Sequence, residues 1–283
     1  MVILKNEAMT VTIKEEGAEM TSVLAKNGVE YLWHGDPKHW GKHAPVLFPI
    51  CSGLINGEYH YEGKTYTLPK HGYAQTKLFT VESATDTEAT FLLCDDEESR
   101  AIYPFAYELR ITYRLNGDTI QVDYDVKNPA EKPLYMSIGA HEAYACPEGI
   151  DAYEIEFPQA ETLYTSTNIS TGHDRKLMLD NSRIFQLHEV DFEASSLNFR
   201  DGTKSNSLIL RNKETGRGVE VVYEDFDHLL LWQPYHAPFL CVEPWCGFPD
   251  VVGHDGDITK KFGIQCVEAG ETFHRVHTIT LLY

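Results

Sequence analysis

Basic residues are scarce in this chain, and long apolar runs are absent. The 283 residues include 24 lysines and arginines against 43 aspartates and glutamates, which gives a formal net charge of −19. A negative field of this kind repels phosphate backbones and anionic lipids, so we expect no nucleic-acid partner and no membrane partner. It also disfavours a polyanionic substrate, unless a local basic pocket overrides the net charge. No stretch approaches the ~20 apolar residues that a membrane-spanning helix needs.

The cysteines show no disulfide or zinc pattern. None of the six forms a CxxC pair, and Cys241 and Cys246 lack a matching second pair. The apolar run Val2–Leu4 is too short for a signal peptide, because Lys5 follows it at once. Scattered cysteines without a secretion signal are typical of reduced thiols. We therefore expect a cytoplasmic protein. For the oligomeric state, we expect a monomer or a homodimer.

Common motifs for nucleotides, nucleophiles and metals are also missing. The chain has no GxGxxG, no GxxxxGK[ST] and no GxSxG sequence. His274 and His277 are three residues apart, which on a strand places them on opposite faces. His39 and His43 would need a helix to share a metal, and Pro45 limits one. We therefore expect no metal site.

Helical periodicity is scarce, whereas alternation with a period of two is frequent. In "YELRITYRL" (107–115) apolar and polar residues alternate, and Asn116-Gly117 then gives a strong hairpin signal. The alternation resumes over 120–127, so this hairpin is the most secure local prediction. Further strands are expected near 27–33, 57–68, 207–225 and 272–283. Residues 37–40 and 173–180 could each form a single helical turn.

Strands without intervening helices favour antiparallel sheets packed as a sandwich or barrel. The chain has no low-complexity linker and no repeat of fixed period. We therefore predict an all-β protein with a single domain over residues 1–283.

Three stretches depart from this pattern, namely 43–76, 134–150 and 229–250. "SIGAHEAYACP" and "FLCVEPW" each place an ionisable residue, His141 and Glu243, at the end of an apolar run. A buried carboxylate is costly unless it is paired, and burial raises its pKa. The alternatives are a core histidine at position 141 and a solvent-facing glutamate at 243. "CVEAGETF" repeats Cys-Val-Glu, but Glu268 leads into a turn and is expected to be solvated.

With these stretches in order, the chain resembles the aldose 1-epimerase (galactose mutarotase) superfamily, and in particular its LacX-like branch. "APVLFPI" with "LPKHGYA" resembles the central block, in which a His-Gly pair follows a proline. "SIGAHEAYACP" resembles the Gly-x-His motif, and "FLCVEPW" resembles the Glu-Pro motif. "EAGETF" resembles the turn before the last strand. The similarity spans residues 1–283, and the order of the motifs is more specific than any one of them.

The resemblance implies a β-supersandwich of large antiparallel sheets with a sugar site on its concave face. It implies that His141 is the general acid and Glu243 the general base of mutarotation, while His71 contacts the sugar or assists the acid. This reaction opens the ring of an aldose and closes it on the other face, and it needs no cofactor. Each such group contributes roughly 10²- to 10⁴-fold in rate near neutral pH.

The chain departs from the family pattern at three positions. Gly53 or a neighbour stands where the family has an arginine, Gln75 replaces a second arginine in "HGYAQT", and Glu142 stands where proline is usual. Gln75 is expected to contact the substrate in place of that arginine. Two missing cations and an added carboxylate favour a neutral aldose over a phosphosugar.

Aromatic residues near the motifs could stack on a pyranose ring. Trp232, Trp245 and Tyr144 are candidates, and core packing is the alternative for each. Two other functions remain open at this point. One is a carbohydrate-binding protein with little turnover. The other is a glycosidase or lyase, which needs a second carboxylate, and only Glu142 or Asp250 is an obvious candidate.

Overall fold

A computed structural model describes residues 1–166, 175–190, 192, 196–234 and 236–283. The strands are β1 (Val2–Lys5), β2 (Met9–Ile13), β3 (Met20–Ala25), β4 (Glu58–Tyr61), β5 (Lys64–Thr67), β6 (Thr80–Ala84), β7 (Glu88–Cys94), β8 (Glu108–Asn116), β9 (Thr119–Lys127), β10 (Leu134–Met136), β11 (Ile138–Gly139), β12 (Glu142–Ala145), β13 (Tyr153–Ser166), β14 (Arg175–Gln186), β15 (Leu197–Phe199), β16 (Ser207–Asn212), β17 (Gly218–Val222), β18 (His228–Trp232), β19 (Phe239–Cys246), β20 (Gln265–Val267) and β21 (Thr272–Leu282). Over these residues the helical elements are short: α1 (Glu97–Ile102) and the 3₁₀ turns η1 (Ile55–Gly57), η2 (Ala74–Thr76), η3 (Ile150–Ala152), η4 (Leu187–Glu189) and η5 (Ile258–Lys260).

The predicted hairpin lies at the middle of the largest sheet. This nine-stranded sheet has the order β14-β13-β16-β17-β21-β9-β8-β7-β6. β8 and β9 pair from Glu108↔Lys127 to Asn116↔Thr119, so the turn falls at Gly117-Asp118. Their apolar residues face the core, and the prediction from alternation is confirmed.

A second, five-stranded sheet carries the strands around His141 and Glu243, which are β11, β12 and β19. Its order is β11-β19-β18-β15, and β12 also pairs with β19. All eight residues of β19 are buried. Both faces of this strand are covered, which explains why "FLCVEPWC" shows no alternation of apolar and polar residues.

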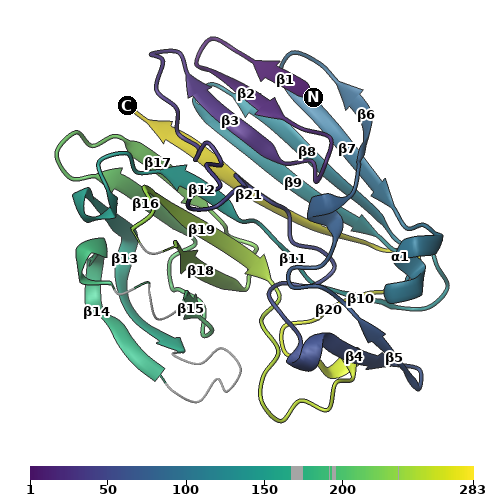
Figure 1. Cartoon of the computed structure of the whole chain (residues 1–283). Coiled ribbons are helices and arrows are strands. Elements are labelled where there is room, and N and C mark those ends of the chain that lie inside the picture. The colour runs from purple at the N-terminus through teal and green to yellow at the C-terminus, as the bar shows by residue number, and fades with distance from the viewer. Residues whose placement is uncertain (167–174, 191, 193–195, 235) are drawn as a thin grey trace.

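The two large sheets and the N-terminal strands enclose the main apolar cluster of the protein. Figure 1 shows β1–β3 drawn over the long strands β8 and β9. The Tyr113 hydroxyl of β8 donates to the Ala18 carbonyl at 2.7 Å, which joins these two layers. The main cluster of buried side chains runs from Leu4 to Leu281. The all-β fold of large antiparallel sheets is thus confirmed, and the single domain over residues 1–283 stays a prediction.

Two local predictions need correction, and one helix was missed. The helical turn expected over 173–180 is wrong, because residues 175–180 belong to the edge strand β14. Residues 173–174 lie outside the described part of the chain. β14 is largely exposed on both faces, so its sequence lacks the alternation of a half-buried strand. The strand expected near 27–33 is limited to isolated bridges at Glu30 and Leu32. Helix α1 was not predicted, since six residues are too few for periodicity and only its Asp96–Ser99 capping box signals it.

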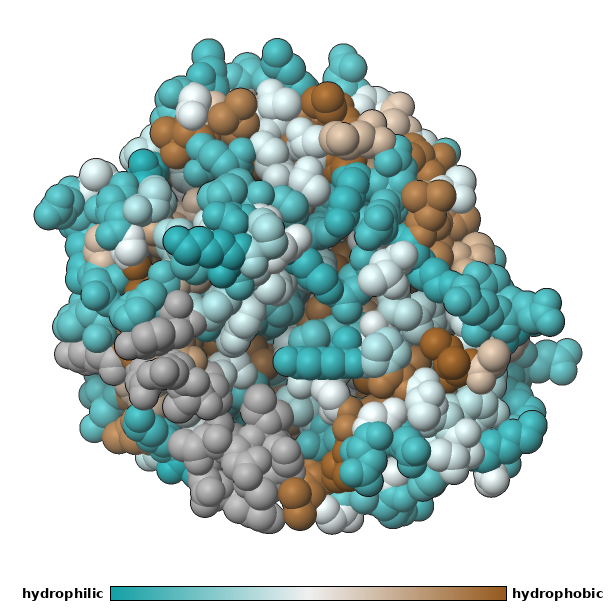
Figure 2. All heavy atoms as spheres, in the orientation of Figure 1, coloured by the Kyte–Doolittle hydropathy of each residue, from teal (hydrophilic) through white to brown (hydrophobic). Residues whose placement is uncertain are grey.

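The outer surface is mainly polar. Figure 2 shows hydrophilic residues over most of one face, with apolar residues in small separate patches. No helix among the described residues is long and apolar enough to cross a membrane. All six cysteines are unpaired, and four of them are buried.

Candidate active site

One cavity brings together all six residues predicted to form the site. It encloses about 450 Å³. The six are His71, Gln75, His141, Trp232, Glu243 and Trp245. The other lining residues are Trp40, Lys42, Pro45, Leu47, Ser52, Lys70, Ser196, Asn198 and Leu230. These side chains come from the long segment between β3 and β6 and from one face of the five-stranded sheet, so only folding makes them neighbours.

His141 and Glu243 form a cross-strand pair. Gly139 pairs with Trp245 and Glu142 with Val242, and the same register sets position 141 opposite position 243. His141 Nε2 lies 3.2 Å from Glu243 Oε2, and the two residues are only 6% and 2% exposed. The low exposure excludes the solvent-facing glutamate considered above. His141 is as buried as a core histidine, but it lies in the cavity wall, where a ligand can reach it.

The pair continues a row of side chains across the sheet. Glu243 pairs with Leu230 on β18, and Leu230 pairs with Asn198 on β15. All of these residues line the cavity, so the floor of the site is one rung of the sheet running from His141 to Asn198. Asn198 is fully buried, and its Nδ2 donates to the Ser196 carbonyl at 3.0 Å.

Burial decides the charge of the His141–Glu243 pair. Desolvation lowers the pKa of His141 to about 3, and desolvation also raises the pKa of Glu243 well above its ordinary value. Both shifts favour the uncharged forms, a neutral imidazole and a protonated carboxyl, because a lone charge is costly in this place. The pair therefore carries one titratable proton between its two groups.

His71 is held with one ring nitrogen fixed. The Ser52 backbone N–H donates to His71 Nδ1 at 3.1 Å, so the neutral ring carries its proton on Nε2. Desolvation, with a smaller effect of His141, lowers the pKa of His71 to about 2. The His71 and His141 rings meet edge to face, with centroids 5.5 Å apart. His71 is thus a neutral hydrogen-bond donor beside the His141–Glu243 pair.

The backbone conformation at residues 71 and 72 explains why glycine follows His71. Both residues adopt the left-handed conformation, with φ of 67°. A Cβ on Gly72 would lie 2.2 Å from the Phe48 carbonyl oxygen. Only glycine permits this close approach, which lets Tyr73 donate to the same carbonyl at 3.0 Å and holds the His71 loop against the "VLFP" segment.

Three tryptophans surround the pair. Trp40 stacks on His141 with ring centroids 5.0 Å apart, and Trp232 meets His141 edge to face at 5.7 Å. Trp245 Nε1 donates to the Ala140 carbonyl at 3.2 Å, and its ring lies where a Cβ of Gly139 would be. The glycine of the Gly-x-His motif thus makes room for the tryptophan that follows Glu-Pro. Trp245 combines core packing with a place in the cavity wall, whereas Trp232 is half-buried.

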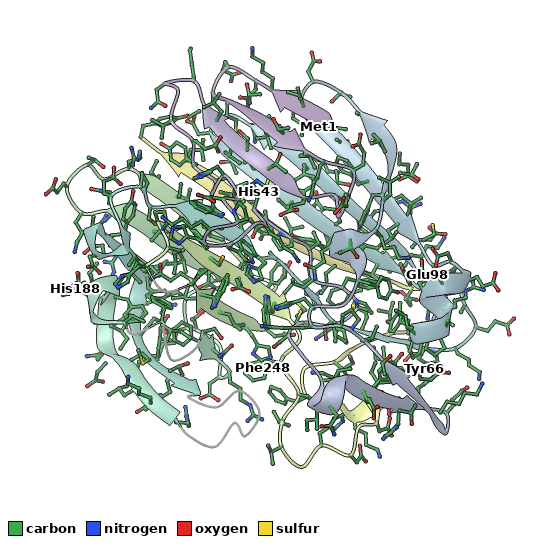
Figure 3. All side chains as sticks on the ribbon, viewed as in Figure 1. Met1, His43, Tyr66, Glu98, His188 and Phe248 are labelled. Atoms are coloured by element: carbon green, nitrogen blue, oxygen red, sulfur yellow. The ribbon has the colours of Figure 1, made fainter. Side chains whose placement is uncertain are left out.

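Four polar or aromatic residues of the cavity wall were not predicted from the sequence, namely Trp40, Lys42, Lys70 and Asn198. They stand in irregular segments or in a short strand, where no periodic pattern distinguishes them. Lys42 Nζ donates to the Gln75 side-chain oxygen, so Gln75 contacts a lysine in the cavity wall. In Figure 3, His43 lies near the centre of the molecule, where the segment with Lys42 crosses the sheets.

Several candidates lie elsewhere. Glu142 points to the opposite face of β12, where its Oε1 lies 3.3 Å from Nε2 of the buried His277. Asp250 lies 2.7 Å from the His254 ring and accepts from the Ile55 N–H. Tyr144 is buried in the core, and Glu268 is exposed in the turn before β21. Neither second carboxylate considered above, and neither Tyr144 nor Gly53, belongs to the cavity wall.

One group of described side chains could hold a metal ion, and it overlaps the pair. The ligand atoms of His141, Cys241 and Glu243 lie within 4.8 Å of one another. Burial, together with Glu243, raises the pKa of the Cys241 thiol well above its ordinary value. A metal binds the thiolate, so this environment disfavours the form that would ligate it.

Comparison with known proteins agrees with this geometry. Residues 1–274 match the profile of the family described as aldose 1-epimerase. The chain belongs to the aldose 1-epimerase family. It is 32% identical over 295 residues to Protein LacX of Lactococcus lactis subsp. lactis, covering 99% of this chain and 98% of that protein.

Solved structures of this family have the same fold. A galactose mutarotase related enzyme from Lactobacillus acidophilus superposes with a TM-score of 0.93 and 30% identity, covering 100% of this chain and 97% of the other. A galactose mutarotase-like protein from Lactobacillus casei gives a TM-score of 0.90 and 26% identity, with both chains fully covered. The resemblance to the aldose 1-epimerase family and its LacX-like members is confirmed; the roles of the individual residues stay predictions.

The backbone contact at Gly72 gives a stability prediction. We expect Gly72→Ala to lower the free energy of unfolding by about 2–4 kcal/mol and Tm by about 5–10 °C, because the new methyl group meets the Phe48 carbonyl. Gly63→Ala is the matched control, since Gly63 has a φ of 75° but no atom within 4 Å of its added Cβ. That change should cost only about 1 kcal/mol. Equal losses of Tm in the two variants would contradict the contact.

Proposed function

We propose that this protein is a mutarotase that interconverts the α and β anomers of an aldose, with Glu243 as base and His141 as acid. The observation that carries the proposal is the buried 3.2 Å contact between these two groups in the wall of a cavity. Membership of the aldose 1-epimerase family supports the same reaction class.

Through this contact one neutral pair can supply both a carboxylate base and an imidazolium acid. Transfer of the shared proton from Glu243 Oε2 to His141 Nε2 produces a carboxylate and an imidazolium. The carboxylate takes the proton of the anomeric hydroxyl while the imidazolium protonates the ring oxygen, and the C1–ring oxygen bond breaks. Rotation about C1–C2 and the reverse transfers close the ring on the other face. Each proton is returned, so the pair is regenerated.

The neighbouring groups suit this sequence. The His71 Nε2–H can donate to a sugar oxygen, because its Nδ1 is already occupied by Ser52. Trp40 covers His141 and excludes water, which strengthens interactions between charges in the cavity. Trp232 offers a ring edge or face to the pyranose.

A glycosidase or lyase is less well supported. Such enzymes need two carboxyl groups flanking the bond. Glu243 is the one carboxylate among the lining residues in the described ranges, while Glu142 and Asp250 pair with His277 and His254 outside the cavity. We also propose a cytoplasmic location, which the six unpaired thiols support.

Substitutions at the pair test catalysis. Glu243→Gln and His141→Ala should each lower kcat/KM by about 10²- to 10⁴-fold, because each removes one proton-transfer group. The measurement is polarimetry of freshly dissolved α-D-glucose and α-D-galactose above the spontaneous rate. Glu268→Gln, in the exposed repeat of Cys-Val-Glu, should be almost silent.

Two outcomes would contradict this proposal. If the unmodified protein and Glu243→Gln both leave the spontaneous rate unchanged while sugars still bind, the protein is a carbohydrate-binding protein. If His141→Ala lowers Tm as severely as it lowers activity, His141 is a structural histidine.

The shared proton also predicts an unusual pH profile. Because the pKa of His141 is lowered to about 3, the second proton that inactivates the pair binds only in strong acid. The pKa of Glu243 is raised, so the pair loses its one proton only well above the ordinary carboxyl range. We expect kcat/KM to stay constant as the pH falls through 6.5, the ordinary histidine value. Tryptophan fluorescence recorded in parallel checks that the fold persists. An acid limb centred near pH 6.5 would contradict the pairing.

A further inference from the structure

Glu142 and His277 form a second buried ionisable pair, on the side of the five-stranded sheet that faces away from the cavity. Glu142 is 3% exposed and His277 is 1% exposed, and Glu142 Oε1 lies 3.3 Å from His277 Nε2. Because Glu142 stands on β12 and His277 on β21, this contact joins the five-stranded sheet to the nine-stranded sheet through the core. Burial of an ionisable pair is costly, and the mechanism proposed above gives neither residue a part.

Glu142 lies directly behind the His141–Glu243 pair. It follows His141 in the chain and pairs with Val242, which precedes Glu243 on β19. Neighbouring strands are about 4.8 Å apart and residues rise by about 3.3 Å, so the Cα atoms of Glu142 and Glu243 are roughly 6 Å apart. The two carboxyl groups leave opposite faces of adjacent strands. Both are buried, so bulk water does not screen the interaction between them.

The carboxyl group of Glu142 has no lysine or arginine partner among the described residues. His277 is the only basic side chain of that part of the chain within 4.0 Å of it. Arg275, two residues before His277 on β21, donates to the His274 carbonyl at 2.8 Å instead. The His277 ring is held in place by stacking on Tyr124, with ring centroids 5.7 Å apart. Glu142 is therefore anchored in the core by one histidine.

The charge of Glu142 acts on groups at both faces of the sheet. In the core, burial raises the pKa values of three tyrosines well above the ordinary value, and Glu142 adds to this effect; they are Tyr113 on β8, Tyr124 on β9 and Tyr144 on β12. At the cavity, burial raises the pKa of Glu243, Lys70 opposes this effect, and Glu142 adds to it. Lys70 is exposed, so salt and water screen its charge, whereas Glu142 is buried.

The other groups that face Glu243 add no buried charge of their own. The titratable side chains of the cavity wall besides Glu243 are Lys42, Lys70, His71 and His141. Desolvation lowers the pKa of His141 to about 3 and that of His71 to about 2, so both rings are neutral. Burial, followed by Glu243 and Glu142, raises the pKa of the nearby Cys241 thiol. The buried negative charge that acts on Glu243 is therefore that of Glu142.

We propose that the contact with His277 holds the carboxylate of Glu142 behind Glu243, where its charge keeps the shared proton on the His141–Glu243 pair. This inference rests on the proposed mutarotase function and assigns a positioning residue outside the cavity. Glu142 touches no substrate and acts through Glu243. A negative charge close to Glu243 disfavours a second one there, so the pair loses its proton only at a higher pH than burial alone would set. Activity then extends further into the alkaline range.

The Glu142→Gln variant tests this inference, because it keeps the shape of the side chain and removes its charge. We expect the alkaline limb of kcat/KM for D-glucose to move to lower pH by about one pH unit, the order of magnitude for a buried charge at this separation. The plateau value should stay within about threefold, since Glu142 lies outside the cavity wall. Polarimetry across the pH range measures both. The shift should persist in added NaCl, because a buried charge is screened little.

Two control variants separate charge from structure. Glu142→Asp keeps the charge on a shorter side chain, so its alkaline limb should stay close to that of the unmodified protein even if Tm falls. Glu161→Gln is the matched control, since Glu161 is 1% exposed and accepts from the N–H groups of Lys204 and Ser205 at 3.1 and 2.7 Å, outside the cavity wall. It should lower Tm and leave the limb in place. An unshifted limb in Glu142→Gln, or an equal shift in Glu161→Gln, would overturn the inference.

Carbon NMR separates this inference from the proposed function, because it needs no turnover. The protein is labelled at the side-chain carboxyl carbon of glutamate, and the Glu243 signal is assigned by its loss in Glu243→Gln. We expect its titration midpoint to fall by about one pH unit in Glu142→Gln. Such a fall in a protein that isomerises no sugar would support the charge effect and refute the mutarotase function. An unchanged midpoint would overturn the inference whatever the activity.

Discussion

The organisation of this site depends on one buried contact, that between His141 and Glu243. The two groups lie 3.2 Å apart in a place that excludes water, so each is costly as a lone charge and together they share one proton. The sheet provides this closeness directly, since both residues stand on paired strands in the same register. The ionisable pair is thus a rung of the sheet, positioned by backbone hydrogen bonds rather than by flexible loops.

Close backbone packing holds the segments around that contact together. Gly139 lets the Trp245 ring lie against β11, and Gly72 lets the loop with His71 approach Phe48. Both glycines belong to the motifs by which the chain resembles its family. These motifs therefore mark places where chain segments lie in close contact, and the same contacts position His71 and His141.

The charged side chains near the cavity lie on different faces of the sheet and on different segments of the chain. His141 and Glu142 are neighbours in sequence, but strand alternation sends the first toward the cavity and the second toward His277 in the core. Lys42 and Lys70 line the cavity from the segment between β3 and β6, where Glu19 and the Ser52–His71 contact hold the backbone.

The sequence by itself determined the all-β class and the 107–127 hairpin, and it predicted that Glu268 lies solvated in a turn, because alternation and turn residues act over short distances. It also marked His141, His71 and Gln75 through ordered motifs. Only the tertiary structure decided that Trp40, Lys42, Lys70 and Asn198 share the cavity, that Glu142 does not, and that residues 175–180 form an edge strand. These facts depend on contacts between segments far apart in the chain and on burial, for which the local pattern of residues carries no signal.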